Sequence, residues 1–165
     1  AKIFNDFFKN KKIIKLYLAI ISPPPSKNKK YITSNIEKSH FSNVRKMTTS
    51  EIKGKFAKTY MKTLVKNSKY ALALLYPITG RTHQLRVHMN YVGCSIIGDK
   101  KYKLNENFRD NENFLKLHSY VIKFPNEDFI KAPLPEHFIN FMKENKLDID
   151  LEKIEKDFEK EFKYE

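Results

Sequence analysis

The chain contains the stretch Gly80-Arg81-Thr82-His83-Gln84-Leu85-Arg86-Val87-His88, which places two arginines, two histidines and a glutamine within nine residues. This stretch follows closely after Tyr70-Ala71-Leu72-Ala73-Leu74-Leu75-Tyr76, a run apolar enough to form a buried strand. A buried strand that delivers cationic and hydrogen-bonding side chains at its own end is typical of a binding or catalytic site.

Local signals predict that the strand is followed by a turn and then by a helix. Pro77 and Gly80 interrupt the strand pattern, and Thr82 is a residue type that favours the start of a helix. We expect the helix over residues 82–92, because Gly93 is a natural helix stop.

The predicted helix has one apolar and one polar face. Leu85 and Met89 recur at helical spacing and are expected to face the core, whereas His83 and Arg86 share a polar face. Arg81 and the amides of the first turn lie at the positive end of the helix dipole, where an RNA phosphate or a carboxylate would bind favourably. Residue types alone leave a functional site and an ordinary polar helix start equally open.

The rest of the chain predicts an α+β fold, with a mixed, largely antiparallel sheet and flanking helices. Apolar patterns predict strands near residues 13–21, 31–37, 56–65, 70–76 and 117–124. A short helix is expected over residues 2–10, and residues 147–162 have the apolar spacing of an amphipathic helix. In the first strand, Lys15 and Tyr17 are expected to point to the same face.

Five segments, in the same order along the chain, resemble the RluA-type RNA pseudouridine synthases. They are Ile14–Ile21, Gly54–Tyr60, the stretch at 80–88 with Gly98-Asp99-Lys100-Lys101-Tyr102, Leu117-His118, and Ala132-Pro133-Leu134-Pro135. The resemblance implies part of the catalytic fold of that family. It also implies isomerisation of specific uridines in structured RNA, ribosomal or transfer RNA, to pseudouridine.

The chemistry implied by the resemblance requires no cofactor. It breaks an N-glycosidic bond, turns the uracil and rejoins it to the sugar through carbon, without a net redox change. The resemblance implies that Arg86 pairs with the catalytic aspartate of the family, because a guanidinium keeps a desolvated carboxylate ionised. It also implies that Tyr17 lies against the target base and sugar and accepts a proton, although a strand tyrosine, judged by residue type alone, more often only packs its ring.

The remaining site residues are implied to bind or orient the substrate. Lys15 is expected to meet RNA phosphate, and Leu85 is expected to form an apolar wall against the uracil. Arg81, Thr82 and His83 are expected to orient the turn or the RNA backbone.

One segment of the family pattern has no match. The nucleophilic aspartate of the family lies in an Arg-Leu-Asp segment before the tyrosine strand, and Asp6 falls in what resembles the following helix. We therefore expect residues 1–142 to be a partial catalytic domain and residues 143–165 to be a C-terminal helical extension. The chain alone is expected to be inactive.

Two other functions remain open at this stage. One is a non-catalytic RNA-binding module, that is, a degenerate synthase. The other is a basic interaction protein that docks through its C-terminal helix. An Arg-Leu-Asp segment upstream would favour the enzyme, whereas an exposed apolar stripe on the monomer would favour the interaction protein.

Composition is consistent with an RNA partner. The net charge is +13, and residues 141–165 oppose it with six lysines and nine acidic residues. The lone Cys94 forms no internal disulfide, which indicates a reducing compartment, cytoplasm or organelle. No metal site is expected, no apolar run is long enough for a membrane span, and a monomer is expected.

Overall fold

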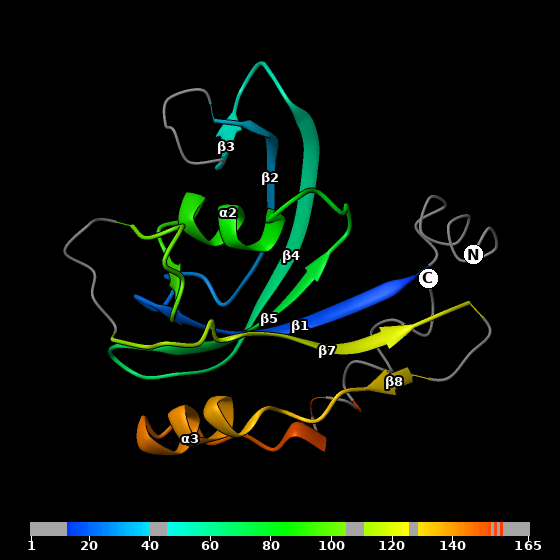
Figure 1. The fold of residues 1–165 in the computed structure, drawn as a ribbon. Helices are drawn as coiled ribbons and strands as arrows, with labels where there is room; N and C mark the ends of the chain where they lie inside the picture. The colour runs from blue at the N-terminus through cyan, green and yellow to red at the C-terminus, as the bar shows by residue number, and fades with distance from the viewer. Residues whose placement is uncertain are drawn as a thin grey trace.

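The structure, a computed structural model, describes residues 13–39, 46–104, 111–125, 129–152, 154 and 156. Its centre is one eight-stranded sheet in the order β3-β2-β4-β5-β1-β7-β8, with β6 paired to β1 (Figure 1). The strands are β1 (Ile14–Ser22), β2 (Lys29–Lys38), β3 (Met47–Ser50), β4 (Lys55–Lys66), β5 (Ala71–Pro77), β6 (Ser95–Ile96), β7 (Leu117–Lys123) and β8 (Phe129–Lys131). The labelled helices are α2 (Gln84–Tyr91) and α3 (Glu136–Glu144).

The predicted α+β class is confirmed, and the five predicted strands correspond to β1, β2, β4, β5 and β7. All pairs among the described strands are antiparallel. Three strands were not predicted, namely β3, β6 and β8. They have four residues or fewer, which is too short for a hydrophobic period to appear. The expected helix at 2–10 lies outside the described residues.

The two faces of the sheet bury separate apolar clusters, because side chains of a strand alternate between faces. Leu16, Leu18 and Ile20 of β1 pack with Phe138 of α3 on one face. The opposite face of β1 packs with α2, and its cluster includes Ala19, Ile21, Leu85 and Met89. Figure 1 shows α2 and α3 on opposite sides of the sheet. Burial of each large apolar side chain contributes about 1.5–3 kcal/mol to this packing.

The C-terminal part of the described chain is joined to the α3 side of the fold. The expected boundary between residues 142 and 143 falls inside α3. Leu147 is fully buried in the same cluster as Phe138, and Leu151 and Ile154 pack against that cluster from helical positions. Phe158, which belongs to the expected amphipathic helix, lies outside the described residues.

Within the described part of the chain, no helix is long and apolar enough to cross a membrane.

Candidate active site

Helix α2 begins one residue later than its predicted cap. The N-cap is His83, in the left-handed region with φ 55°, and it makes no side-chain capping bond. The expectation that Thr82 caps the helix is therefore wrong. The Gln84 side chain closes the turn instead, because its Oε1 accepts bonds from the Arg81 N–H at 3.0 Å and from the Thr79 hydroxyl at 2.7 Å.

Buried polar side chains fix α2 to strands β2 and β4. Gln84 Nε2 donates to the Lys58 carbonyl at 3.0 Å and to the Thr59 hydroxyl at 2.9 Å. His88 is fully buried, and its two ring nitrogens lie 2.8 Å from Thr59 Oγ1 and 3.0 Å from Ser34 Oγ. Burial lowers the pKa of His88 to about 4, so the ring is neutral near pH 7. These bonds set the orientation of α2 and so position Arg86.

The Arg86 side chain forms a two-point ion pair with Asp99. Nε lies 2.8 Å from Asp99 Oδ2, and Nη2 lies 2.7 Å from Oδ1. The Asp99 side chain is 1% exposed, whereas that of Arg86 is 20% exposed. The ion pair therefore has a buried carboxylate and a guanidinium that reaches the surface.

The Asp99 carboxylate is also held by the backbone that follows it. Its Oδ1 accepts the N–H groups of Lys101 and Tyr102, both at 2.9 Å. Burial by itself would raise the pKa of Asp99, but the hydrogen bonds from Arg86, Tyr102 and Lys101 outweigh it and hold the pKa below its usual value. Asp99 is therefore ionised at neutral pH.

Tyr102 completes this cluster by contacting both His83 and Arg86. The Arg86 guanidinium lies 4.8 Å from the centre of the Tyr102 ring. The Tyr102 hydroxyl accepts the Met47 N–H at 3.0 Å and lies 2.8 Å from His83 Nδ1. Burial and then the nearby Arg86 and Lys101 lower the pKa of His83.

Gly98 allows the chain to bring Asp99 to Arg86. Gly98 has φ +78°, and a Cβ there would overlap the Phe114 carbonyl. Gly98 and Asp99 belong to one of the segments that carry the family resemblance, but no role was predicted for either residue. The only sequence signal for a role of Asp99 was an acidic residue directly after a glycine in a strongly basic chain. Its partner Arg86 lies thirteen residues earlier in the sequence.

Three of the predicted site residues gather on the α2 side of β1. Tyr17 packs against the cluster that contains Leu85, whose exposed fraction is 7%. The Lys15 ammonium lies 3.9 Å from where a Cβ on Gly80 would be, at the start of the turn into α2. Burial lowers the pKa of Lys15. The structure thus places the Lys15 ammonium beside the β5–α2 turn and Tyr17 on the face of the sheet that packs against Leu85.

The two other predicted residues lie in that turn. Arg81 is half-buried, and its Nε donates to the Phe56 carbonyl at 2.9 Å. Thr82 is exposed. Among the residues that the structure describes, no group of three or more side chains is arranged to hold a metal ion.

The family model described as RNA pseudouridylate synthase matches residues 1–91, which is more than half of the chain. The chain therefore belongs to the RNA pseudouridylate synthase family, and the predicted resemblance is confirmed.

Relatives of the chain carry consistent names. It is 36% identical over 141 residues to ribosomal large subunit pseudouridine synthase C of Rickettsia bellii, covering 81% of the chain and 46% of the relative. It is 34% identical to ribosomal large subunit pseudouridine synthase D of Borreliella burgdorferi, covering 86% of the chain and 45% of the relative. The chain thus spans about half the length of these relatives.

A solved structure has the same architecture. Human RNA pseudouridylate synthase domain containing 1 superposes with a TM-score of 0.69 at 25% identity, over 80% of this chain and 58% of the human chain.

Proposed function

We propose that the protein carrying this chain isomerises uridine to pseudouridine in ribosomal RNA of the large subunit. Family membership supports an isomerase, and the names of the relatives favour ribosomal over transfer RNA. The observation that carries the proposal is the Arg86–Asp99 ion pair, which holds a partly exposed guanidinium on helix α2, the helix that also carries Leu85.

Arg86 has the geometry to serve a second carboxylate. Its Nε and Nη2 bond to Asp99, and within the described residues Nη1 has no hydrogen-bond partner. A guanidinium is a planar fork of five donors, so the edge formed by Nη1 and Nη2 can bind another carboxylate. We assign that edge to the nucleophilic aspartate that the family resemblance places in an Arg-Leu-Asp segment. Asp99 then holds the Arg86 guanidinium in place, so that the arginine side chain need not reorganise when the second carboxylate binds.

The reaction on this assignment is a balanced isomerisation. The aspartate attacks or supports the sugar as the bond between N1 and C1′ breaks, the uracil turns, and C5 bonds to C1′. C5 loses its proton and N1 of the product carries one. We assign the acceptance of the C5 proton to the Tyr17 hydroxyl, and the apolar wall against the uracil to Leu85.

The cationic residues of the site are proposed to hold the RNA backbone. The Lys15 ammonium lies close to Gly80 in the β5–α2 turn, and Arg81 donates to the Phe56 carbonyl near the start of β4. Their charges suit phosphate contacts, which position RNA without reading its sequence. Exposed Thr82 and partly exposed His83 complete this proposed backbone contact.

We further propose that residues 1–142 are part of the catalytic domain, that residues 143–165 extend it, and that the protein acts as a monomer. On this account the 165-residue chain alone leaves uridine unchanged, because the assigned nucleophile segment is not among its residues. A non-catalytic RNA-binding module is the competing function.

Turnover of Arg86 variants tests the proposal. The full-length protein with Arg86→Ala or Arg86→Lys is incubated with large-subunit ribosomal RNA, and pseudouridine is counted by mass spectrometry of nucleosides. We expect Arg86→Ala to lose most activity, about a hundredfold or more. Lys143→Ala, an exposed substitution on α3, is the matched control and should keep full activity. Near-normal turnover of Arg86→Ala would show that Arg86 is structural, and no pseudouridine from the unsubstituted protein would favour the RNA-binding module.

A further inference from the structure

Strands β2 and β4 carry exposed aromatic rings on the side of the sheet that faces away from α2. Ile32 and Met61 belong to the cluster beneath α2, and side chains alternate along a strand. Their neighbours Tyr31 and Tyr60, which are partners in the sheet register, therefore point to the opposite side. Phe56 points the same way as Tyr60, four residues along β4. We call Tyr31, Phe56, Lys58 and Tyr60 the β2–β4 face.

Two rings of this face, those of Tyr31 and Phe56, are open to solvent. Tyr31 is 60% exposed and Phe56 is 54% exposed. Tyr60 is buried and supports Tyr31 with a distance of 5.2 Å between ring centroids. Tyr31 and Phe56 lie about 13 Å apart along the strands, which is four residues of extended chain. Two separated, exposed rings on a sheet are an arrangement on which bases stack.

Positive charge lies between and around the two rings. The Lys58 ammonium lies 4.6 Å from the centroid of the Tyr31 ring. Within β4, Lys58 and Lys62 alternate with the buried Met61 and Thr59 and therefore lie on the same side of the sheet as Tyr60. This distribution favours a polyanion.

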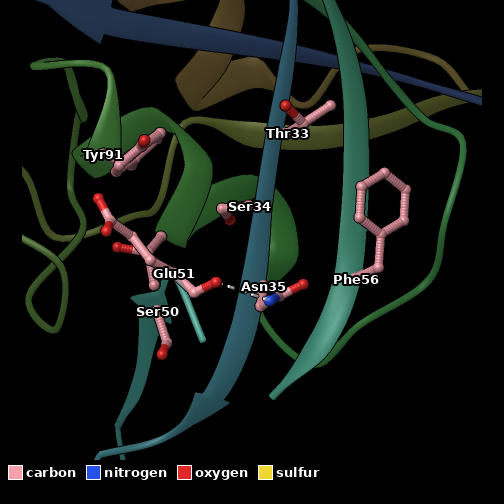
Figure 2. Close-up of a pocket in the computed structure, with 8 residues that line it drawn as sticks. Thr33, Ser34, Asn35, Ser50, Glu51, Phe56 and Tyr91 are labelled. Carbon is pink, nitrogen blue, oxygen red and sulfur yellow. Dashed lines mark hydrogen bonds between the residues drawn. The ribbon is translucent and has the colours of Figure 1, made fainter. Parts of the chain in front are cut away.

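A polar pocket adjoins the Phe56 ring. It has a volume of about 520 Å³ and is lined by side chains of β2, β3, β4 and the end of α2, as Figure 2 shows. Thr33, Asn35, Ser50 and Glu51 contribute hydrogen-bonding groups, and the Asn35 amide donates to the Glu51 carbonyl at 3.5 Å. The pocket, which Phe56 also lines, thus offers donors and acceptors for the edge of an unstacked base.

We propose that the β2–β4 face binds a single-stranded segment of RNA, with bases stacked on Tyr31 and Phe56 and the backbone near Lys58. This binding goes beyond the proposed isomerisation, because the face lies across the sheet from Tyr17 and Leu85. Cations between the rings and a polar pocket favour RNA over an apolar protein partner, whose interface would be depleted of lysine. The face would hold a stretch of substrate RNA that runs past the target uridine.

Binding of oligonucleotides without uridine separates this proposal from the isomerisation. The full-length protein is titrated against fluorescent single-stranded oligoadenylate and oligocytidylate, and the dissociation constant is measured by anisotropy at two salt concentrations. Tyr31→Ala and Phe56→Ala should each weaken binding about tenfold, the scale of one lost stacking contact. Tyr31→Phe keeps the ring and should bind as the unsubstituted protein does. Lys58→Gln should reduce the slope of the logarithm of the binding constant against the logarithm of the salt concentration by about one.

Phe114→Ala is the matched control, because Phe114 is also 60% exposed but lies outside this face. It should leave the dissociation constant unchanged, and circular dichroism melting confirms that each variant is folded. The proposal is overturned if the double variant Tyr31→Ala with Phe56→Ala binds both oligonucleotides as tightly as the unsubstituted protein. It is also overturned if the unsubstituted protein shows no binding at about 100 μM. A change of oligomeric state in the double variant with unchanged RNA binding would identify the face as a protein interface instead.

Discussion

Arg86 and Asp99 form an ion pair in which both carboxylate oxygens accept from the same guanidinium, at 2.7 and 2.8 Å. The pair joins helix α2 to the segment after β6. Nε and Nη2 of Arg86 make these bonds, and helix α2 lies on the side of the sheet on which Tyr17 packs. The account of this protein as an isomerase rests on that geometry.

Replacing Asp99 by Asn should remove the charge while keeping the shape. The pKa of Asp99 is below its usual value in the folded protein. The ionised carboxylate therefore adds to the free energy of unfolding above about pH 4, and this contribution is lost as the pH falls through the folded pKa. Asp99→Asn should therefore lower the free energy of unfolding by about 2 kcal/mol at pH 7. Urea denaturation at several pH values measures this, and the difference between the two proteins should shrink in acid. An equal difference at pH 7 and pH 3 would show that the carboxylate charge is not responsible.

Tyr17→Phe separates a chemical role of the hydroxyl from a packing role of the ring. The substitution deletes one oxygen from a residue that packs against the cluster beneath α2. If the hydroxyl accepts a proton, turnover of the full-length protein should fall about a hundredfold, whereas RNA affinity and melting temperature stay the same. Equal turnover with a lower melting temperature would instead assign Tyr17 to packing.

The buried His88 should make the stability of the protein depend on pH. An unfolded histidine takes up a proton near pH 6.5, whereas folded His88 remains neutral down to about pH 4. The unfolded state thus binds more protons in this window, and stability falls as the pH falls through it, by about 3 kcal/mol in all. His88→Gln should flatten the stability profile between these pH values in urea titrations. Parallel profiles would show that His88 does not titrate as described.

Two glycines with similar dihedral angles give a matched test of the backbone around Asp99. Gly98 has φ +78° and Gly93 has φ +81°, but only a Cβ on Gly98 would meet backbone, the Phe114 carbonyl. Gly93→Ala should cost about 1 kcal/mol, the penalty of the left-handed conformation. Gly98→Ala should cost clearly more and should also reduce turnover, because Asp99 must move. Comparable melting temperatures for the two variants would contradict this explanation of Gly98.

Removing residues 147–165 should destabilise the domain without changing its affinity for RNA. Leu147 is 1% exposed in the cluster that includes Phe138, on the face of the sheet opposite α2. Loss of this packing should lower the melting temperature or the solubility. A large gain in RNA affinity on deletion would mark the acidic tail as an inhibitory mimic of nucleic acid.

Sequence patterns predicted the parts of the fold that depend on local periodicity. The long strands and α2 follow from alternation and helical spacing, and the order of motifs identified the family. The cap of α2 was not predictable. Residue preferences favour Thr82 as the cap, but the N-cap is His83, which adopts a left-handed conformation and makes no side-chain capping bond. The partner of Arg86 was also missed, since the contact with Asp99 exists only when β6 pairs with β1 and the chain turns at Gly98.

The central claim is that this chain supplies the arginine and the tyrosine of a pseudouridine synthase site, while the nucleophile lies in an upstream segment. The most direct test is the number of pseudouridines formed in large-subunit ribosomal RNA by the full-length protein and by the 165-residue chain, at equal concentrations and with folding checked by circular dichroism. The account predicts conversion of specific uridines by the full-length protein and none by the chain alone. Pseudouridine made by the purified 165-residue chain would contradict it.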